Sequence, residues 1–213
     1  GIGEVRQIGS LAASLGRKVL LVTGASFARE SGLSARLERL LGEAGVAAVG
    51  VSCSGEPDTS TVDLAALKGR EAGVDVVVAV GGGSVLDFGK CLAGAIPNAH
   101  PVRDYLEGIG NGAVMERDPL PIIAVPTTAG TGSEATRNAV VTWKEGRAKK
   151  SFRDPRLVPR VALVDPELAL SAPPELTAAC GMDALTQLIE PLTSLNAFVL
   201  TDVLAVSGLS ALR

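Results

Sequence analysis

Three consecutive glycines followed by a serine are the residues of this chain best suited to hold a phosphate. Gly81, Gly82 and Gly83 precede Ser84, and Asp87 comes one helical turn later. Backbone without Cβ atoms can adopt positive φ and approach a ligand closely, and the N–H groups and dipole of a following helix attract an anion. The pattern predicts a phosphate-binding turn, with a tight strand-to-helix turn without ligand as the alternative.

A second run of small and hydroxyl-bearing residues occupies 126–134 and has the sequence PTTAGTGSE. The hydroxyl groups of Thr127, Thr128 and Thr131, together with nearby backbone N–H groups, could bind a phosphate, a ribose or a carboxamide. An exposed loop without a ligand is the alternative. The run is therefore a second candidate binding loop.

Asp183 and Gln187 form a third candidate pair, within the sequence GMDALTQLIEPLTS of residues 181–194. On a helix they lie on adjacent turns, so both side chains can point at one metal ion or substrate oxygen. An exposed polar stripe, shared with Glu190, is the alternative. The apolar residues of this helix fall at i, i+3, i+4 and i+7 and predict a core-facing stripe, made of Leu185, Leu188, Ile189 and Leu192.

The elements that must position these residues alternate between strands and helices. The apolar, β-branched run 76–80 before the glycines predicts a central strand of a parallel sheet, buried on both faces. Further strands are expected over 18–23, 46–51, 120–125, 138–143 and 160–164, with helices near 8–15, 33–41, 64–72 and 85–92. This order predicts a right-handed parallel α/β sheet whose ligand crevice lies beyond the strand carboxyl ends, where Gly24 and Gly81 fall.

Three other segments complete the predicted organisation. Residues 97–121 are rich in Pro, Gly and Asn and predict a surface connection, in which His100, the one histidine of the chain, is solvated. Lys149 and Lys150 are expected in a solvated turn. From Pro173 onward the pattern is helical, through a last segment at 197–213.

Composition excludes several classes of function. The 213 residues carry a net charge of -3 and show no basic run, which argues against a nucleic-acid partner. Three cysteines far apart give neither a metal knuckle nor a disulfide framework. No apolar run approaches the ~20 residues that span a bilayer, and the first residues lack a signal-peptide pattern, so the cytoplasm is the expected location and no membrane partner is expected.

Four motifs in order resemble the iron-containing (group III) alcohol dehydrogenases. They are the glycine turn with Asp87 and Lys90, the 126–134 run, Asp165-Pro166, and 181–185, GMDAL. The resemblance implies an NAD(P)-binding, Rossmann-like domain over 1–170, followed over 171–213 by the first helices of an incomplete all-α domain, with a divalent metal between the domains. It also implies an alcohol or carbonyl substrate and a homo-oligomer. Family members are longer, and the start of this chain lacks the opening strand expected for the family.

The resemblance assigns roles residue by residue. It implies that Gly82, Gly83 and Ser84 hold the pyrophosphate with Asp87 nearby. The rest of the dinucleotide site would be lined by Thr127, Thr128, Thr131, Asn138 and Lys149. Asp183 matches the metal-binding aspartate of the family, whereas the histidine expected one turn later is Gln187. A neutral amide oxygen suits iron or zinc less well than imidazole does, so metal affinity is expected to fall.

The resulting hypothesis is an NAD(P)-dependent oxidoreductase that interconverts an alcohol and an aldehyde or ketone. The alternatives are a dehydroquinate-synthase-like enzyme, a metal-independent enzyme resembling maleylacetate reductase, and a nucleotide-binding fragment without catalysis. NADP is favoured slightly over NAD, because Gly24 stands where family members that use NAD often have an aspartate that repels a 2′-phosphate. Ser26 could donate a hydrogen bond to that phosphate, with Arg29 adding charge.

Overall fold

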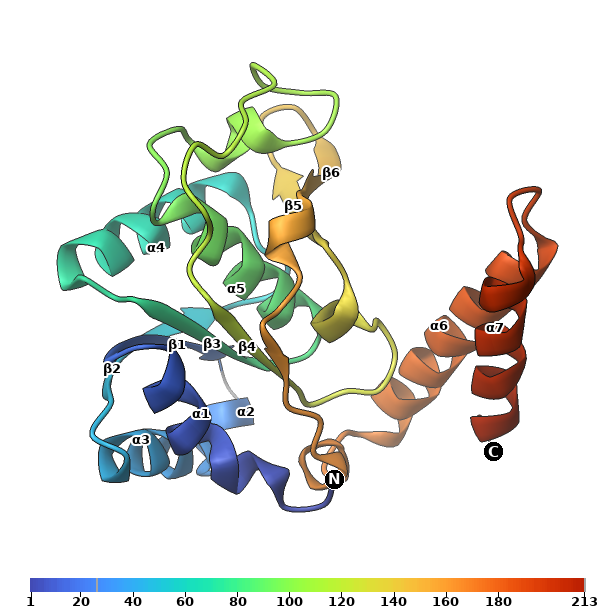
Figure 1. Cartoon of the computed structure of the whole chain (residues 1–213), viewed down its shortest axis with the longest axis horizontal. Coiled ribbons are helices and arrows are strands. Elements are labelled where there is room, and N and C mark those ends of the chain that lie inside the picture. The colour runs from blue at the N-terminus through green and yellow to red at the C-terminus, as the bar shows by residue number, and fades with distance from the viewer. Residues whose placement is uncertain (26, 213) are drawn as a thin grey trace.

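The computed structural model describes residues 1–25 and 27–212, except for the side chains of Phe27 and Arg29. Across these residues, five strands form one parallel sheet in the order β2-β1-β3-β4-β7 (Figure 1). This confirms the predicted α/β class. The strands are β1 (Lys18–Gly24), β2 (Ala47–Cys53), β3 (Val76–Gly81), β4 (Ile122–Pro126) and β7 (Val161–Ala162).

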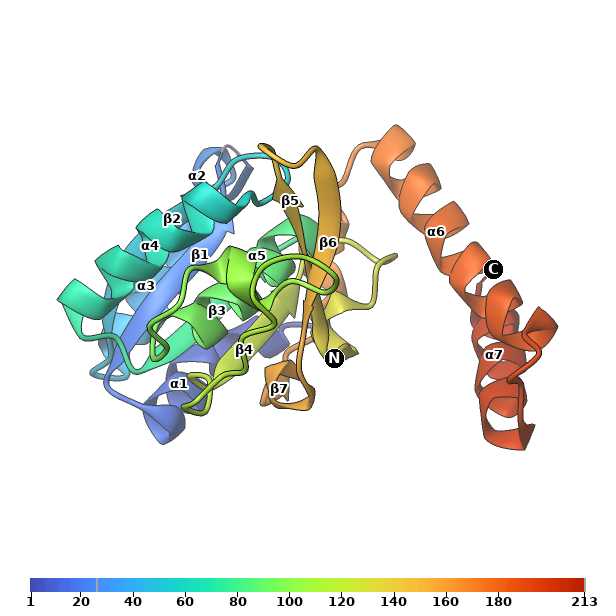
Figure 2. The same ribbon diagram turned by 90° about the horizontal axis from the view of Figure 1, so that it is seen from above.

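Helices cover both faces of the sheet, as a parallel sheet requires (Figure 2). Successive strand residues point to opposite faces, so Val77 and Ala79 belong to one apolar cluster and Val76 and Val78 to the other. All residues of β3 are buried, which confirms its prediction as the central strand. One layer contains α1 (Ile8–Leu15) and α3 (Leu33–Glu43), and the other contains α4 (Thr59–Ala72) and α5 (Gly83–Ala95), while the short α2 (Phe27–Glu30) follows β1.

A β-hairpin packs beside α5, and the sequence predicted only the first of its two strands. Strand β5 (Asn138–Trp143) was predicted, but Lys149 and Lys150 lie in a strand, β6 (Ala148–Arg153), rather than in a solvated turn. Antiparallel pairing with β5 satisfies the backbone of this polar segment. Phe152 anchors it, because its side chain is only 2% exposed and belongs to the main apolar cluster.

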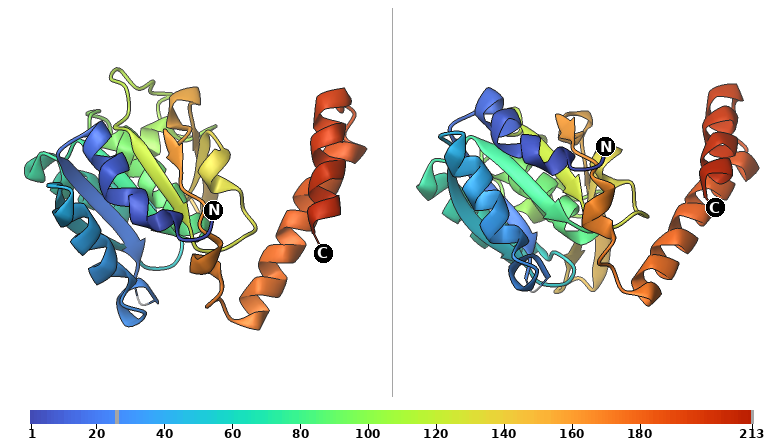
Figure 3. Two further views of the ribbon diagram at one scale, coloured as in Figure 1. Left: turned by 60° about the horizontal axis from the view of Figure 1, so that its bottom comes forward. Right: turned by 90° about the horizontal axis from the view of Figure 1, so that it is seen from below.

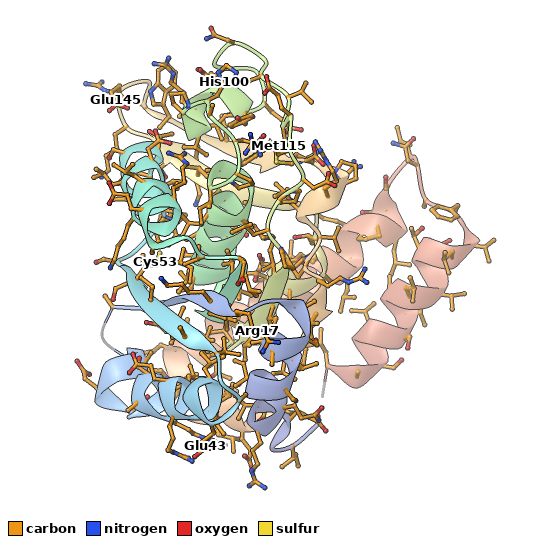
Figure 4. The ribbon with its side chains drawn as sticks, turned by 60° about the vertical axis from the view of Figure 1, so that its left-hand side comes forward. Arg17, Glu43, Cys53, His100, Met115 and Glu145 are labelled. Carbon is orange, nitrogen blue, oxygen red and sulfur yellow. The ribbon has the colours of Figure 1, made fainter. Side chains whose placement is uncertain are left out.

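Residues 97–121 are more than the surface connection that was predicted. His100 is exposed, as expected, but Val102, Leu106 and Met115 are buried. Figure 4 marks the positions of His100 and Met115 in this segment. The ring of Tyr105 stacks on Phe152 with 5.0 Å between ring centroids. This segment therefore contributes buried apolar side chains that cover the hairpin, in addition to its turns. The sequence predicted the turns but not this contribution to the core.

Two C-terminal helices, α6 (Pro174–Thr193) and α7 (Val199–Ala211), pack on each other and project from the α/β body (Figures 1 and 3). The predicted core-facing stripe of α6 is only half-buried, and Ile189 is 45% exposed. None of the described residues of α6 is fully buried, because α7 covers only part of its surface. The division at residues 170 and 171 stays a prediction.

No helix in the described part of the chain is both long enough and apolar enough to cross a membrane.

Candidate functional site

A cleft of about 1160 Å³ opens at the carboxyl ends of the central strands. Strand register places Gly24 beside Cys53, and Gly81 beside Pro126, along this edge of the sheet. Ser26 lies outside the described residues. The cleft brings together all the other predicted site residues, which are Gly24, Gly81, Gly82, Gly83, Ser84, Asp87, Thr127, Thr128, Thr131, Asn138, Lys149, Asp183 and Gln187.

Packing, rather than positive φ, explains the three glycines of the turn. The structure describes all three, and none has positive φ; Gly82 has φ −75°. A Cβ at Gly81 would lie 2.6 Å from the side chain of Val85, and one at Gly83 would lie 2.7 Å from Thr131. At Gly82 the nearest atom is the Thr128 hydroxyl oxygen, 3.3 Å away. Gly82 is therefore the least crowded of the three, and a side chain there would enter the cleft after a small shift of the Thr128 side chain.

The N-terminus of α5 faces the same cleft without a side-chain cap among the described residues. Val85 and Leu86 donate their N–H groups to the Gly82 carbonyl, so the N–H groups of Gly83 and Ser84 precede the first bonds of the helix. Backbone donors and the positive end of the helix dipole together favour an anion here. The turn thus fits a pyrophosphate group.

The loop after β4 forms the opposite wall. Thr127 donates its N–H to the Gly81 carbonyl at 3.0 Å, which holds the start of this loop beside the glycine turn. Its tip reaches α6, since a Cβ at Gly130 would lie 2.9 Å from the Cys180 carbonyl. Gln187 also donates from Nε2 to the Gly130 carbonyl at 3.5 Å. This loop therefore links the sheet edge to the helical pair.

Asp87 lies on the cleft wall, but groups of the chain itself surround its carboxylate. Oδ1 accepts a hydrogen bond from the Ser133 hydroxyl at 2.6 Å, and Oδ2 accepts one from the Val140 N–H at 2.9 Å. The ammonium of Lys90 lies 3.2 Å from Oδ1. This arrangement favours a role in holding the loop over a direct contact with a phosphate.

Lys149 reaches the cleft from β6 and forms an ion pair with Glu56. The hydrogen bond and charge of Lys149 lower the pKa of Glu56. The prediction missed the segment Ser54 to Glu56, which follows β2 and also lines the cleft. The rule that placed Gly24 and Gly81 at the carboxyl edge could have found it, because β2 ends at the same edge.

Two cysteines also line the cleft, and neither was predicted there. Cys53 ends β2, and Cys180 lies on α6 one turn before Asp183. Burial raises the pKa of Cys53 to about 11, so its thiol stays protonated at neutral pH. Its Sγ donates to the Gly55 carbonyl at 3.4 Å. Cys53 is thus a packed, unreactive part of the wall.

The donors present do not by themselves make a metal site. Asp183 and Gln187 offer one carboxylate and one amide oxygen to the cleft, fewer than the three or four protein ligands usual for zinc. Among residues 1–25 and 27–212, no group of three or more His, Cys, Asp or Glu side chains could hold a metal ion. A metal ion in the cleft would need further ligands beyond these two side chains.

A parallel sheet with a glycine turn at its carboxyl edge is the arrangement of Rossmann-like α/β proteins. The sequence model of the iron-containing alcohol dehydrogenase family matches residues 1–166. The "Probable alcohol dehydrogenase EutG" of Escherichia coli (strain K12) is 38% identical over 211 residues, which cover 99% of this chain and 52% of that protein.

Two solved structures show the same fold. The H277A mutant of ADH/D1, an archaeal halo-thermophilic Red Sea brine pool alcohol dehydrogenase, matches with a TM-score of 0.90 and 34% identity, covering 97% of this chain and 53% of that chain. Sulfoacetaldehyde reductase from Bifidobacterium kashiwanohense, solved in complex with NAD+, matches with a TM-score of 0.88 and 36% identity, covering 96% and 54%.

The chain therefore belongs to the iron-containing alcohol dehydrogenase family, a family of oxidoreductases that bind NAD(P) and iron or another divalent metal. It spans about half the length of the relatives it matches.

Proposed function

We propose that this chain is the dinucleotide-binding part of an NAD(P)-dependent oxidoreductase that interconverts an alcohol and an aldehyde or ketone. The main observation behind this proposal is that three features line one cleft: the glycine turn, the N-terminus of α5, and the loop after β4. We call this loop, which contains Thr127, Thr128 and Thr131, the threonine loop. The complex of a relative with NAD+ supports the same interpretation. In this proposal residues 1–170 bind the dinucleotide, and residues 171–213 begin a helical domain.

The proposed roles follow from position in the cleft. The backbone of Gly82 and Gly83, with Ser84, binds the pyrophosphate at the start of α5. The hydroxyl groups of the threonine loop and the charge of Lys149 orient the rest of the dinucleotide. Hydride transfer is the chemistry that a bound nicotinamide supplies, and the chain contributes binding, orientation and a wall against water. On the wall of the cleft opposite the glycine turn, the residues proposed to contact the dinucleotide are Thr127, Thr128, Thr131 and Asn138.

NADP(H) is proposed to bind at least as well as NAD(H). Gly24 ends β1 and lines the cleft, and the nearest atom to a Cβ placed there would be Val85 Cγ2 at 3.9 Å. The site thus has neither a repelling carboxylate nor a blocking side chain at this position. A neutral, open position at the end of β1 is compatible with a 2′-phosphate.

Metal binding by this chain alone is proposed to be weak. Asp183 is one strong donor and Gln187 a poor one for iron or zinc. The 213-residue chain should lose added zinc or ferrous iron during dialysis, as measured by elemental analysis. A stoichiometric metal that survives dialysis would contradict this expectation.

A metal-independent reductase of the same family, resembling maleylacetate reductase, is the second candidate function. Gln187 favours it, because an amide replaces the expected imidazole donor. An enzyme of this kind should keep its activity in the presence of a chelator, whereas a metal-dependent alcohol dehydrogenase should lose it.

Absorbance of the reduced nicotinamide separates an enzyme from a binding module. The protein expressed from its whole reading frame is mixed with NADH or NADPH and a panel of aldehydes and ketones, and with the oxidised cofactors and alcohols. Substrate-dependent consumption or production of reduced cofactor is the expected result. Tight cofactor binding without turnover on any substrate would instead favour a non-catalytic nucleotide-binding protein.

A further inference from the structure

Lys90 on α5 carries a charge inside the protein, and the proposed reaction gives it no task. Its side chain is only 1% exposed. The ammonium donates to the carbonyl oxygens of Ser133 at 2.9 Å and Asn138 at 2.5 Å, and to the hydroxyl of Thr136 at 3.1 Å. Burial lowers the pKa of Lys90, and the charge of Asp87 opposes that shift. Burying an ammonium group costs free energy unless hydrogen bonds and an opposite charge compensate it. The hydrogen bonds and the ion pair of Lys90 provide this compensation, and the groups that make them show what the side chain holds in place.

Every neutral acceptor of Lys90 belongs to one segment, 133–138. Asp87, one turn earlier on α5, binds the same segment through the Ser133 hydroxyl and the adjacent Val140 N–H. The two side chains therefore hold both ends of the segment, at the short helix η3 (Ser133–Ala135) and at the start of β5. Hydrogen bonds to charged groups are stronger than neutral ones, which makes this a firm attachment.

The residues just before this segment contact the glycine turn. A Cβ at Gly83 would lie 2.7 Å from Thr131, and a Cβ at Gly82 would lie 3.3 Å from Thr128. The two walls of the cleft are thus in near contact at the proposed pyrophosphate site. A shift of the loop by a few tenths of an ångström would change the shape of that site.

We propose that Lys90 is a positioning residue for the cofactor: it fixes the threonine loop at the distance from the glycine turn that dinucleotide binding requires. The inference rests on the proposed function for its cofactor part. Lys90 itself does not touch the cleft, since it is absent from the residues that line it in the described structure. Its effect is transmitted through Ser133, Thr136 and Asn138.

The test replaces Lys90 by methionine, which keeps the length and apolar stem of the side chain and removes the donors. The matched control is Lys68→Met, because Lys68 also donates to a backbone carbonyl, that of Gly50 at 2.8 Å, but lies at the surface of α4. Two readouts are taken on each protein: fluorescence titration with NADPH and NADH, and hydrogen exchange of peptides covering 127–140 in the absence of cofactor.

We expect Lys90→Met to speed hydrogen exchange selectively in residues 127–140. We also expect the dissociation constant for the dinucleotide to rise by about tenfold, which is the change that results if only a tenth of the molecules hold the loop in its binding conformation. Lys68→Met should match the parent in both readouts. A purely structural role would instead lower the unfolding temperature while the loop exchange and the affinity of the folded protein stay unchanged. That result would overturn the proposal.

A second variant keeps the test decisive if Lys90→Met does not fold. Ser133→Ala removes the hydroxyl bond to Asp87 and leaves the ammonium in place, so a smaller increase in exchange is expected. Unchanged exchange in Ser133→Ala would also count against the proposal. If the parent protein binds neither dinucleotide, the proposed function fails, and the exchange data alone still show whether Lys90 fixes the loop.

Discussion

At the scale of single residues, Asp165 holds the N-terminal segment on the α/β body. Its side chain is 2% exposed. Its carboxylate accepts backbone N–H groups from Gly3, Val5 and Glu167, each at 3.1 Å. Burial raises the pKa of Asp165, but the hydrogen bonds from the three backbone donors outweigh it and lower the pKa. The Asp165-Pro166 motif therefore has a structural role in this chain.

This lowered pKa predicts a loss of stability in acid. A carboxylate with a depressed folded-state pKa stabilises the fold above its ordinary pKa of about 3.9, and this contribution is lost as pH falls through the folded-state value. Asp165→Asn should cost about 1–3 kcal/mol at pH 7, since one amide cannot accept all three bonds. Urea unfolding from pH 7 to pH 3 should show the gap to the parent narrowing, with Asp183→Asn, an exposed site, as control. A gap of constant size would contradict this assignment.

Gly24 gives a second prediction at this scale. Gly24→Asp should shift preference from NADP(H) toward NAD(H), because the new carboxylate repels a 2′-phosphate and accepts hydrogen bonds from ribose hydroxyls. The position is open, and φ there is not positive, so an aspartate fits without strain. Gly42→Asp, on the exposed surface of α3, adds the same charge away from the cleft. Titration of both cofactors checks it, and a strong preference of the parent for NAD(H) would overturn the interpretation.

At the scale of elements, α4 shows how a cap decides where a helix begins. The apolar pattern predicted a helix from 64, but α4 begins at Thr59. Asp58 accepts the Thr61 N–H at 3.0 Å, and the Thr61 hydroxyl accepts the Asp58 N–H, which forms a capping box. The Asp-Thr-Ser-Thr sequence carries this signal, and a search for apolar spacing alone passes over it.

Two variants of the cap separate its hydrogen bond from its ion pair with Lys144. Asp58→Ala should lower the free energy of unfolding by about 1 kcal/mol, because α4 loses its N-cap. Asp58→Asn keeps an N-cap acceptor and loses only the charge that pairs with the exposed Lys144, so its loss should be smaller than that of Asp58→Ala. Chemical denaturation measures both. Equal losses would assign the stabilisation to the ion pair instead.

Strand β6 illustrates what local pattern could not predict. Its sequence AKKSFR has one large apolar residue, and nothing in its own composition distinguishes it from a turn. Pairing with β5 and the burial of Phe152 decide its structure, and both depend on contacts distant in sequence. Lys149 was assigned to the site through resemblance, and its location on a strand became visible only in the structure.

At the scale of the whole molecule, the sheet and the cleft were predictable for one physical reason. Strands buried on both faces have continuous apolar sequences, and loops that follow parallel strands meet at one edge. From the amino-acid pattern alone, that rule placed Gly24 and Gly81 at one edge, and the structure adds the loop that follows β4 to the same edge. The helical pair was harder, because the burial of α6 depends on what packs against it, and α7 alone leaves its stripe half-covered.

The central claim is that the cleft at the glycine turn binds a dinucleotide, and Gly82→Val tests it most directly. Of the three glycines, Gly82 is the least crowded, because a Cβ there needs only a shift of a few tenths of an ångström in the Thr128 side chain. Valine at this position should therefore obstruct the cleft without unfolding the protein. The matched control is Gly50→Val in β2, where a Cβ has no neighbour within 4 Å. Fluorescence titration with NADPH and NADH is performed on all three proteins. We predict binding by the parent and Gly50→Val and none by a folded Gly82→Val; unchanged affinity in Gly82→Val would contradict the account.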